Sequence, residues 1–198
     1  MRGFFGIGVE RINKPYNVGN VFRSAHAFGA SFVFTVNATY ERNKGARSDT
    51  SDSLGQMPFY SFPDVASMVL PKGCALVGVE LLDDAVDLPS FRHPLQAAYI
   101  LGPERASLSA ETVARCDHVI KIPTRFCLNV GIAGALVMYD RVMSRGRFAP
   151  RPVRTGGPVE DLPAHVSGAP KMRAQASMEM FRDTPPLAEV GVTEAEEA

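Results

Sequence analysis

The sequence predicts an α/β domain in which helices cover both faces of a parallel sheet. Several short runs, of which residues 31–36 are the clearest, are apolar almost throughout rather than at every second position. Such runs are typical of strands that are buried on both faces. They alternate with segments whose apolar residues recur at helical spacing. With 198 residues, 45% of them hydrophobic, the chain can bury one sizeable core.

The N-terminal half predicts a β-α-β unit followed by polar connections. The predicted elements are a strand at 4–10, a helix at 17–28 that ends at Gly29, a strand at 31–36 and a short helix at 64–70. Residues 37–56 between them are polar and contain several Gly and Ser residues. We therefore expect an exposed loop or short helices there.

The C-terminal half continues the alternation and then changes in composition. The predicted elements are strands at 74–80, 97–101 and 118–122, a helix at 109–116 with Ser109 as its N-cap, and a helix at 129–145. We expect residues 1–148 to form the domain. Residues 149–198 are Pro/Gly-rich and then acidic, which predicts a largely disordered linker and tail, with one short amphipathic helix as an option at 172–181.

Charge and cysteine content exclude few partners but favour a reducing compartment. Lys plus Arg equal Asp plus Glu at 21 each, so the net charge indicates neither a nucleic acid nor a membrane surface. The three cysteines show no CxxC and no paired His spacing, which argues against disulfides and against a metal site. No apolar run approaches the roughly 20 residues of a membrane span. We expect a cytoplasmic protein without membrane contact.

Polar residues gather in three loops that each follow a predicted strand. The first, "NKPYNVGNVFR", contains Asn17, Asn20 and Arg23, and positions 20 and 23 share a face of the following helix. The second is "ILGPERASLS" and the third is "KIPTRFCLN", which precedes an almost wholly apolar helix. Each loop alone reads most simply as a cap or a turn. Together they predict a ligand site, because ligands bind at the carboxyl ends of parallel strands.

The segments "PYNVGNVFRSAHAFGA", "ILGPERASLS" and "IPTRFCLNVGIAGALVMYD", in this order, resemble the three motifs of the SpoU (TrmH-like) RNA methyltransferases of the SPOUT superfamily. The resemblance implies a deep trefoil knot at the C-terminal end of the sheet, although knots are rare in proteins. It also implies that S-adenosylmethionine is the cofactor, that methyl groups go to ribose 2′-hydroxyls of RNA, and that the last helix packs in a homodimer.

The same resemblance assigns site residues to this chain. The expected catalytic group comprises Arg23, Asn17, Glu104 and Asn129, and the expected cofactor-binding residues are Leu101, Gly102, Pro103, Ile122, Pro123, Cys127, Leu128 and Asn129. Because a guanidinium stays protonated, Arg23 is expected to stabilise developing negative charge on the ribose oxygen rather than to act as a base. Asn17, Glu104 and Asn129 would position it.

Two features depart from the family pattern. Cys127 stands where the family usually has serine, and a thiol is a weaker hydrogen-bond partner than a hydroxyl. The loop that contains Cys127 also looks shorter than usual. The resemblance implies tRNA as the substrate, with rRNA as the alternative, because the chain resembles compact members of the family. The candidate phosphate contacts are Lys14, Arg42, Lys44 and Arg47.

Three other functions fit the sequence less well. A dinucleotide-binding domain would need a G-x-G-x-x-G after the first strand, where only "GIG" within the strand is found. A Cys127 hydrolase lacks a recognisable histidine partner. A knotted RNA-binding or assembly module without catalysis is the stronger alternative. The retention of four residues together argues against it, namely Asn17, Arg23, Glu104 and Asn129.

Overall fold

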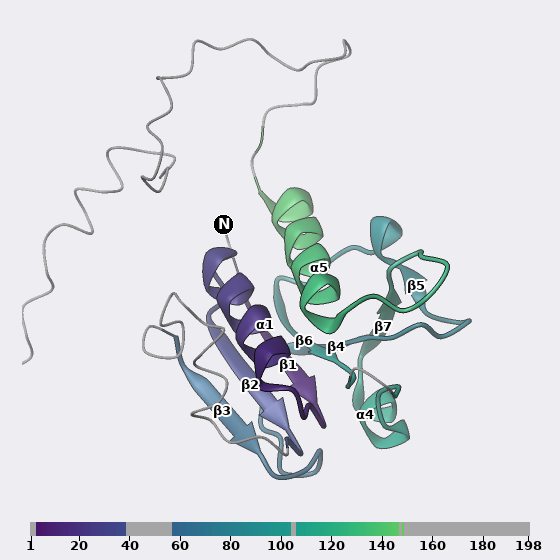
Figure 1. The fold of residues 1–198 in the computed structure, drawn as a ribbon. Coiled ribbons are helices and arrows are strands. Elements are labelled where there is room, and N and C mark those ends of the chain that lie inside the picture. Colours follow the sequence, from purple (N-terminus) through teal and green to yellow (C-terminus); the bar gives the residue numbers. More distant parts are fainter. Residues whose placement is uncertain (1–2, 39–56, 104–105, 147, 149–198) are drawn as a thin grey trace, which may run out of the picture. The chain divides into compact units, whose positions relative to one another are not determined.

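The computed structural model describes residues 3–38, 57–103, 106–146 and 148 of the chain. In these residues seven strands form one parallel sheet in the order β3-β2-β1-β6-β4-β7-β5 (Figure 1). The strands are β1 (Phe4–Glu10), β2 (Phe32–Val36), β3 (Phe59–Phe62), β4 (Ala75–Val79), β5 (Val86–Asp87), β6 (Gln96–Leu101) and β7 (His118–Lys121). The predicted α/β fold with a parallel sheet is confirmed.

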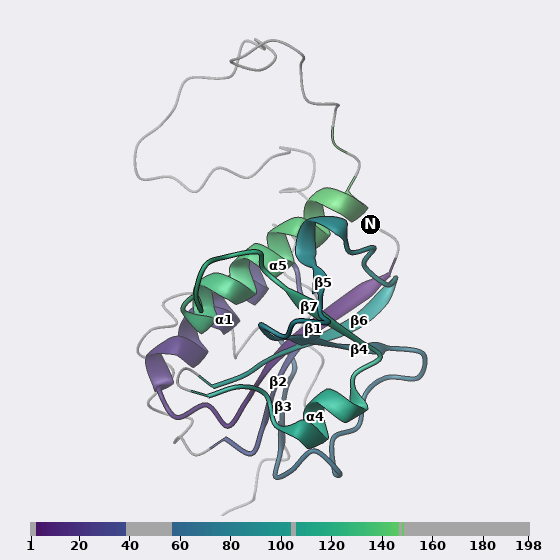
Figure 2. The same ribbon diagram turned by 90° about the vertical axis from the view of Figure 1, so that its right-hand side faces the viewer.

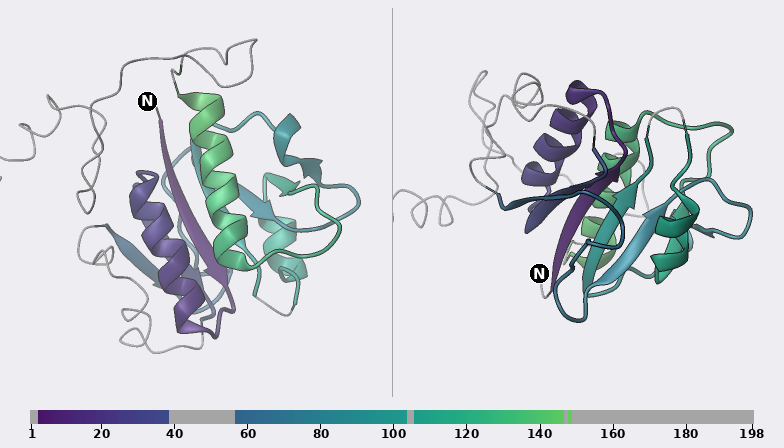
Figure 3. Two further views of the ribbon diagram at one scale, coloured as in Figure 1. Left: turned by 45° about the horizontal axis from the view of Figure 1, so that its top comes forward. Right: turned by 90° about the horizontal axis from the view of Figure 1, so that it is seen from below.

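Helices cover both faces of this sheet. The helices are α1 (Pro15–Ala27), α4 (Ala110–Arg115), α5 (Val130–Arg145) and the short 3₁₀ helix η1 (Leu88–Ser90). Helices α1 and α5 lie side by side on one face, as the left view of Figure 3 shows, and α4 lies on the opposite face (Figure 2). Strands that are covered in this way must be apolar on both faces, which explains their continuous apolar runs.

The alternation of side chains along each strand produces two separate hydrophobic cores. Tyr99 and Leu101 of β6 join the core beneath α1 and α5, whereas Ala98 and Ile100 join the core beneath α4. All five residues of β2 are buried for the same reason. Gly8 of β1 leaves room for a neighbouring ring, because a β-carbon there would lie 2.5 Å from the side chain of Phe34.

A buried polar network fastens α5 to the amino-terminal end of β6. Arg141 is 1% exposed and donates to the backbone oxygens of Phe4, Pro94 and Leu95 and to the hydroxyl of Tyr99. The Tyr99 hydroxyl lies 2.5 Å from Nδ1 of His93, and Nε2 of His93 lies 2.9 Å from Asp140 Oδ2. Since buried polar groups need partners, this network fixes the position of α5 over the sheet.

The predicted short helix at 64–70 is wrong. The side chain of Asp64 accepts a hydrogen bond of 2.7 Å from the backbone N–H of Ser67, and the Ser67 hydroxyl donates back to the backbone oxygen of Asp64. This local turn competes with helix formation. In addition, the guanidinium of Arg115 occupies two backbone oxygens of the segment, one of them that of Val65.

The other differences concern short elements and element ends. Strands β3 and β5 and the helix η1 were not predicted, and α1 begins at Pro15, two residues before the predicted start. Residues 39–56 of the predicted loop and the predicted tail at 149–198 lie outside the described residues, so the domain boundary stays a prediction. None of the helices in the described ranges is long and apolar enough to cross a membrane.

Candidate functional site

A cavity of about 440 Å³ opens at the carboxyl ends of three neighbouring strands, β6, β4 and β7. Its walls come from the residues that follow these strands and from the first turns of α5. They are Val79, Glu80, Leu81, Leu101, Gly102, Pro103, Ala106, Ser107, Ile122, Thr124, Cys127, Leu128, Val130 and Ala133. This position and this volume are typical of a small-molecule site in an α/β domain.

Two glutamates hold the loop that follows β6 against the cavity. Glu80 Oε2 accepts a hydrogen bond of 2.7 Å from the backbone N–H of Leu108, and Glu10 Oε2 accepts one of 2.8 Å from the backbone N–H of Ser109. Arg11 donates to the backbone oxygen of Ser107 at 2.7 Å. Because these bonds join the loop to the ends of β4 and β1, this wall of the cavity is set before a ligand arrives.

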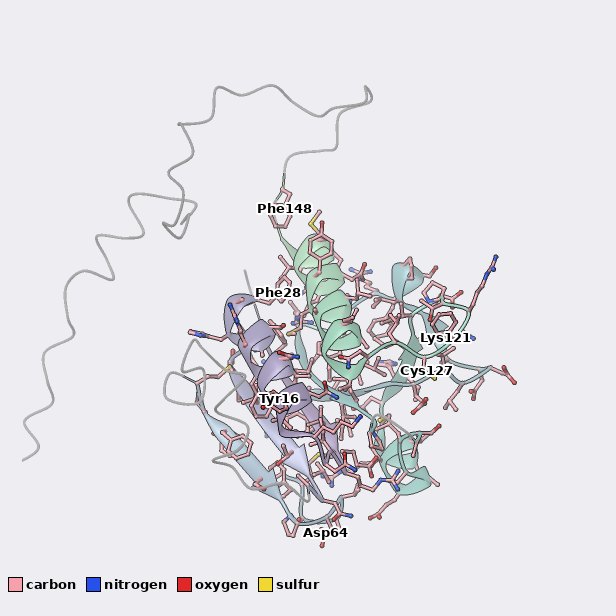
Figure 4. The ribbon with its side chains drawn as sticks, in the orientation of Figure 1. Tyr16, Phe28, Asp64, Lys121, Cys127 and Phe148 are labelled. Carbon is pink, nitrogen blue, oxygen red and sulfur yellow. The ribbon has the colours of Figure 1, made fainter. Side chains whose placement is uncertain are left out.

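The connection between β7 and α5, on which Cys127 is labelled in Figure 4, forms another wall of the cavity. The hydroxyl of Thr124 lies 2.9 Å from the backbone oxygen of Phe126 and 3.3 Å from that of Ile122, so it closes a tight loop. Phe126 itself is 76% exposed. Asn129 ends the connection and caps α5, since its side-chain oxygen accepts a hydrogen bond of 2.9 Å from the backbone N–H of Gly131.

A second concavity, the groove between α1 and α5, lies beside the cavity. Its volume is also about 440 Å³, and it is lined by Asn20, Arg23, Ser24, Phe28, Asn129, Gly131, Ile132, Ala135, Leu136 and Tyr139. Asn129 belongs to this groove, whereas its neighbours Leu128 and Val130 line the cavity. Asn129 also donates a hydrogen bond of 3.3 Å to Asn17. The cap of α5 therefore separates the two sites and touches both chain segments that form the groove.

The structure brings most of the expected cofactor-binding residues together. Leu101, Gly102, Pro103, Ile122, Cys127 and Leu128 line the cavity, whereas Pro123 is exposed and is not among the lining residues. Arg23 lines the groove and not the cavity, and Asn17 reaches the groove through Asn129. Lys14 is exposed just before α1. Glu104, Arg42, Lys44 and Arg47 lie outside the described residues.

Sequence reasoning missed three polar residues of the cavity, which are Glu80, Ser107 and Thr124. Glu80 directly follows β4, so the rule that ligands gather at strand ends could have found it. Ser107 and Thr124 lie inside motifs that were recognised, but their alcohols are common in ordinary turns. No group of three His, Cys, Asp or Glu residues within the described ranges could hold a metal ion.

The shape and chemistry of the cavity fit a nucleoside-type ligand. Its lining is mostly aliphatic, with a few polar groups, and a volume of about 440 Å³ falls within the roughly 300–1,000 Å³ that is usual for small-molecule sites. Because Gly102 has no side chain, its backbone itself forms part of the cavity wall. A β-carbon at this position would lie 3.0 Å from the backbone nitrogen of Leu108 and 3.3 Å from Glu80 Oε2. A larger residue would therefore displace this wall.

Comparison with known proteins identifies relatives of this arrangement. The sequence model of the SpoU rRNA Methylase family matches residues 5–139. The tRNA (guanosine(18)-2'-O)-methyltransferase of Escherichia coli (strain K12) is 27% identical over 142 residues, which are 69% of this chain and 62% of that protein. The 23S rRNA (uridine(2479)-2'-O)-methyltransferase of Streptomyces viridochromogenes is 30% identical over 164 residues, 75% of this chain and 56% of that protein. The chain thus spans less than two thirds of the length of these relatives.

Solved structures show the same fold. The SpoU methyltransferase AviRb from Streptomyces viridochromogenes, in complex with the cofactor AdoMet, has a TM-score of 0.64 at 27% identity. The similarity covers 73% of this chain and 59% of that one. A structure described as giving insights into the 2-OH methylation of C/U34 on tRNA has a TM-score of 0.63 at 21% identity. The similarity covers 74% of this chain and all of that chain. At this identity the similarity shows a shared fold alone.

Proposed function

This chain belongs to the SpoU rRNA methylase family, and from that premise we propose that it transfers a methyl group from S-adenosylmethionine to a ribose 2′-hydroxyl of RNA. One observation carries the proposal. The residues that match the second and third family motifs, among them Gly102, Ile122 and Leu128, converge on a single cavity at the carboxyl ends of β6 and β7. A nucleoside-sized site at this edge of the sheet is what the reaction requires.

S-adenosylmethionine, when bound, supplies an electrophilic methyl group. The aliphatic side chains of Leu101, Ile122 and Leu128 would pack against the adenosine, and the backbone around Gly102 would approach it closely. The tight loop closed by Thr124 would limit access of water from the other side. Since these walls are held by hydrogen bonds within the protein, the cavity is preorganised, and positioning of this kind can contribute roughly 7–11 kcal/mol to catalysis.

Arg23 would act on the nucleophile. In the reaction the ribose oxygen forms a bond to the methyl carbon, the carbon–sulfur bond breaks, and the hydroxyl proton passes to an RNA phosphate or to another group. A guanidinium cannot accept that proton, but it stabilises the negative charge that develops on the oxygen. Arg23 is exposed on α1 and faces the groove beside Asn129, outside the cavity. The ribose would therefore bind where the groove meets the cavity or where a second subunit closes it.

We propose that a second copy of this chain binds in the groove between α1 and α5. Ile132, Leu136 and Tyr139 follow one another at helical spacing on α5 and are 55%, 39% and 49% exposed. A stripe of this kind beside Arg23 is suited to the self-complementary interface of a two-fold dimer. Dimerisation would bring Arg23 and the cavity of different subunits together.

The trefoil knot is part of the same proposal. Strand β7 lies beyond β4 in the sheet, yet the next element, α5, lies beside α1. A β-carbon at Gly134 of α5 would lie 3.4 Å from Ile7 of β1 and 3.8 Å from Leu101 of β6. The chain must therefore return across the sheet after β7. Threading of this return through the connection between β4 and β6 would produce the knot.

The proposed substrate is tRNA. Support comes from the relative in Escherichia coli, whose name specifies a tRNA, although the Streptomyces relative is named for 23S rRNA. Lys14, Arg42, Lys44 and Arg47 would contact phosphates, which makes RNA binding weaker as salt rises. A protein that modifies tRNA would work in the cytoplasm.

The test compares the wild-type protein with Arg23→Ala. Methyl transfer is measured from radiolabelled S-adenosylmethionine to separate tRNA and rRNA fractions, and cofactor binding is measured by calorimetry. We expect the variant to bind S-adenosylmethionine normally and to lose methyl transfer. Unchanged turnover would refute the role of Arg23. A wild-type protein that binds no S-adenosylhomocysteine at micromolar concentration would instead favour a non-catalytic RNA-binding module.

A further inference from the structure

Glu80 places a carboxylate at the wall of the cavity. It is the only Asp, Glu, Lys or Arg among the described lining residues, and the other described walls are neutral or aliphatic. Its Oε2 would lie 3.3 Å from a β-carbon at Gly102, so the carboxylate stands directly beside the glycine of the second motif. The family resemblance assigns no role to this position, which directly follows β4.

The carboxylate retains capacity for a ligand. Oε1 accepts a hydrogen bond from the backbone N–H of Leu81 at 3.0 Å, and Oε2 accepts one from Leu108 at 2.7 Å. Two oxygens of a carboxylate can accept about four hydrogen bonds, so these two leave part of it open. Within the described chain no cation forms an ion pair with Glu80. The nearby ammonium of Lys121 donates to the backbone oxygens of Leu82 and Asp83 instead.

A charge in such a place acts on any ligand in the cavity. Coulomb attraction falls only as the inverse of distance, and its strength grows as water is excluded. Unlike a hydrogen bond, this attraction does not require one particular pose.

The reaction itself changes the charge of the ligand. S-adenosylmethionine carries a positive sulfonium in addition to its amino-acid ammonium and carboxylate, whereas S-adenosylhomocysteine carries a neutral thioether. Building on the function proposed above, we propose that Glu80 makes the cavity select the cationic cofactor over the neutral product. Loss of the methyl group then removes the attraction, and the product leaves more readily than the cofactor.

The experiment measures three dissociation constants by calorimetry on the full chain. The ligands are S-adenosylmethionine, sinefungin, which carries a protonated amine in place of the methyl sulfonium, and S-adenosylhomocysteine. The variants are Glu80→Gln, which removes the charge, and Glu80→Asp, which keeps it on a shorter side chain. Asp83→Asn is the matched control, because Asp83 is an exposed acid on the same connection and outside the cavity. Thermal unfolding and circular dichroism check that each variant folds.

The expected result is a change in the ratio of the dissociation constants of the cationic ligands and the thioether. We expect the wild-type protein and Asp83→Asn to prefer both cationic ligands over the thioether by about tenfold, and Glu80→Gln to lose most of that preference. Glu80→Asp should keep the preference for the cationic ligands even if its affinity for every ligand falls, because the charge remains. If Glu80→Gln does not fold, loss of the preference in Glu80→Asp would still contradict the inference. Glutamine has only one acceptor oxygen, so it also loses one of the two backbone hydrogen bonds, from Leu81 or from Leu108, but that loss would weaken all three ligands alike.

Four outcomes would overturn the inference. Equal weakening of all three ligands in Glu80→Gln would mean that Glu80 only supports the loop or bonds to a group that all three share. Unchanged affinities for all three ligands would mean that the charge has no influence. A wild-type protein that binds the three ligands equally well refutes the selectivity but leaves the proposed function intact, whereas one that binds none of them refutes both.

Discussion

The side-chain amide of Asn129 donates a hydrogen bond of 3.3 Å to the side-chain oxygen of Asn17, which lies 112 residues earlier in the chain. The same side chain caps α5 through the backbone N–H of Gly131. One residue thus fixes the start of α5, ties it to the start of α1 and stands between the cavity and the groove that contains Arg23. The first and third sequence motifs meet at this contact.

We expect Asn129→Ala and Asn129→Asp to separate these two roles. Alanine removes both the cap and the link to Asn17, and loss of the cap should lower the free energy of unfolding by about 1 kcal/mol. Aspartate can still cap the helix and is favoured at its positive end, but it cannot donate to Asn17. Urea unfolding should therefore show a stable Asn129→Asp protein, and methyl transfer should fall in both variants. Wild-type turnover in Asn129→Asp would argue that the link to Asn17 is not needed.

We expect Gly102→Ala to weaken cofactor binding. The added β-carbon would lie 3.0 Å from the backbone nitrogen of Leu108, so the loop must shift and the cavity wall with it. The affinity for S-adenosylhomocysteine should fall by about tenfold, which corresponds to ~1.4 kcal/mol. Gly134→Ala is the control, because its β-carbon would make only ordinary contacts, 3.4 Å from the end of the Ile7 side chain and 3.8 Å from that of Leu101, and alanine favours the helix. Equal affinities in the two variants would speak against the proposed wall.

The strands of the sheet could be predicted from the sequence because burial on both faces demands apolar side chains at nearly every position. Strand β2, with five buried residues, is the clearest case. The two residues of β5 are exposed and owe their assignment to pairing with β7, which leaves no local pattern. The segment after Pro63 had helical spacing, but its backbone oxygens are used by Arg115, a partner about 50 residues away. Contacts of this range cannot be inferred from a local pattern.

The candidate site could be predicted in part. The recognised motifs identified six residues that line the cavity, among them Leu101 and Ile122, because a parallel sheet brings its carboxyl strand ends together. They also placed Asn20 and Arg23 on one face of a helix, and both line the groove. The separation of Arg23 from the cavity could not be foreseen, since it depends on how α1 and α5 pack. Glu80 was missed because it belongs to no motif.

We expect Arg141→Met to destabilise the protein strongly. The substitution preserves apolar volume but leaves the backbone oxygen of Pro94 and the hydroxyl of Tyr99 without their buried donor. Each buried acceptor that is left without its donor typically costs about 1–3 kcal/mol, so the urea midpoint should fall sharply at about pH 7.5. Arg145→Met on the last turn of the same helix is the control and should change stability by less than about 1 kcal/mol. Similar midpoints in both variants would contradict the anchoring role.

We expect stability to fall as the pH drops below about 6.5, and His93 to be one cause. Burial lowers the pKa of His93 below its ordinary value of 6.5, Arg141 acts in the same direction, and Asp140 opposes them. The unfolded chain therefore binds a proton at a pH where the folded protein does not. The resulting contribution of His93 to the free energy of unfolding is complete above pH 6.5 and is lost as the pH falls toward the lowered pKa. Burial also raises the pKa of Tyr99 to about 12, so its hydroxyl stays protonated throughout.

His93→Gln tests this pH dependence, because glutamine can accept from Tyr99 and donate to Asp140 without titrating. Urea midpoints measured between pH 5 and pH 8 should decline less steeply toward acid in the variant than in the wild-type protein. Parallel curves would show that the protonation of His93 does not control acid stability.

The most direct test of the account is a crystal structure of this protein grown with S-adenosylhomocysteine. We predict density for the nucleoside in the cavity between Gly102 and Leu128, with Glu80 at its wall and the cap of Asn129 beside the methionine end. Ligand density elsewhere on the molecule, or a cavity filled by the protein's own side chains at saturating ligand, would contradict it.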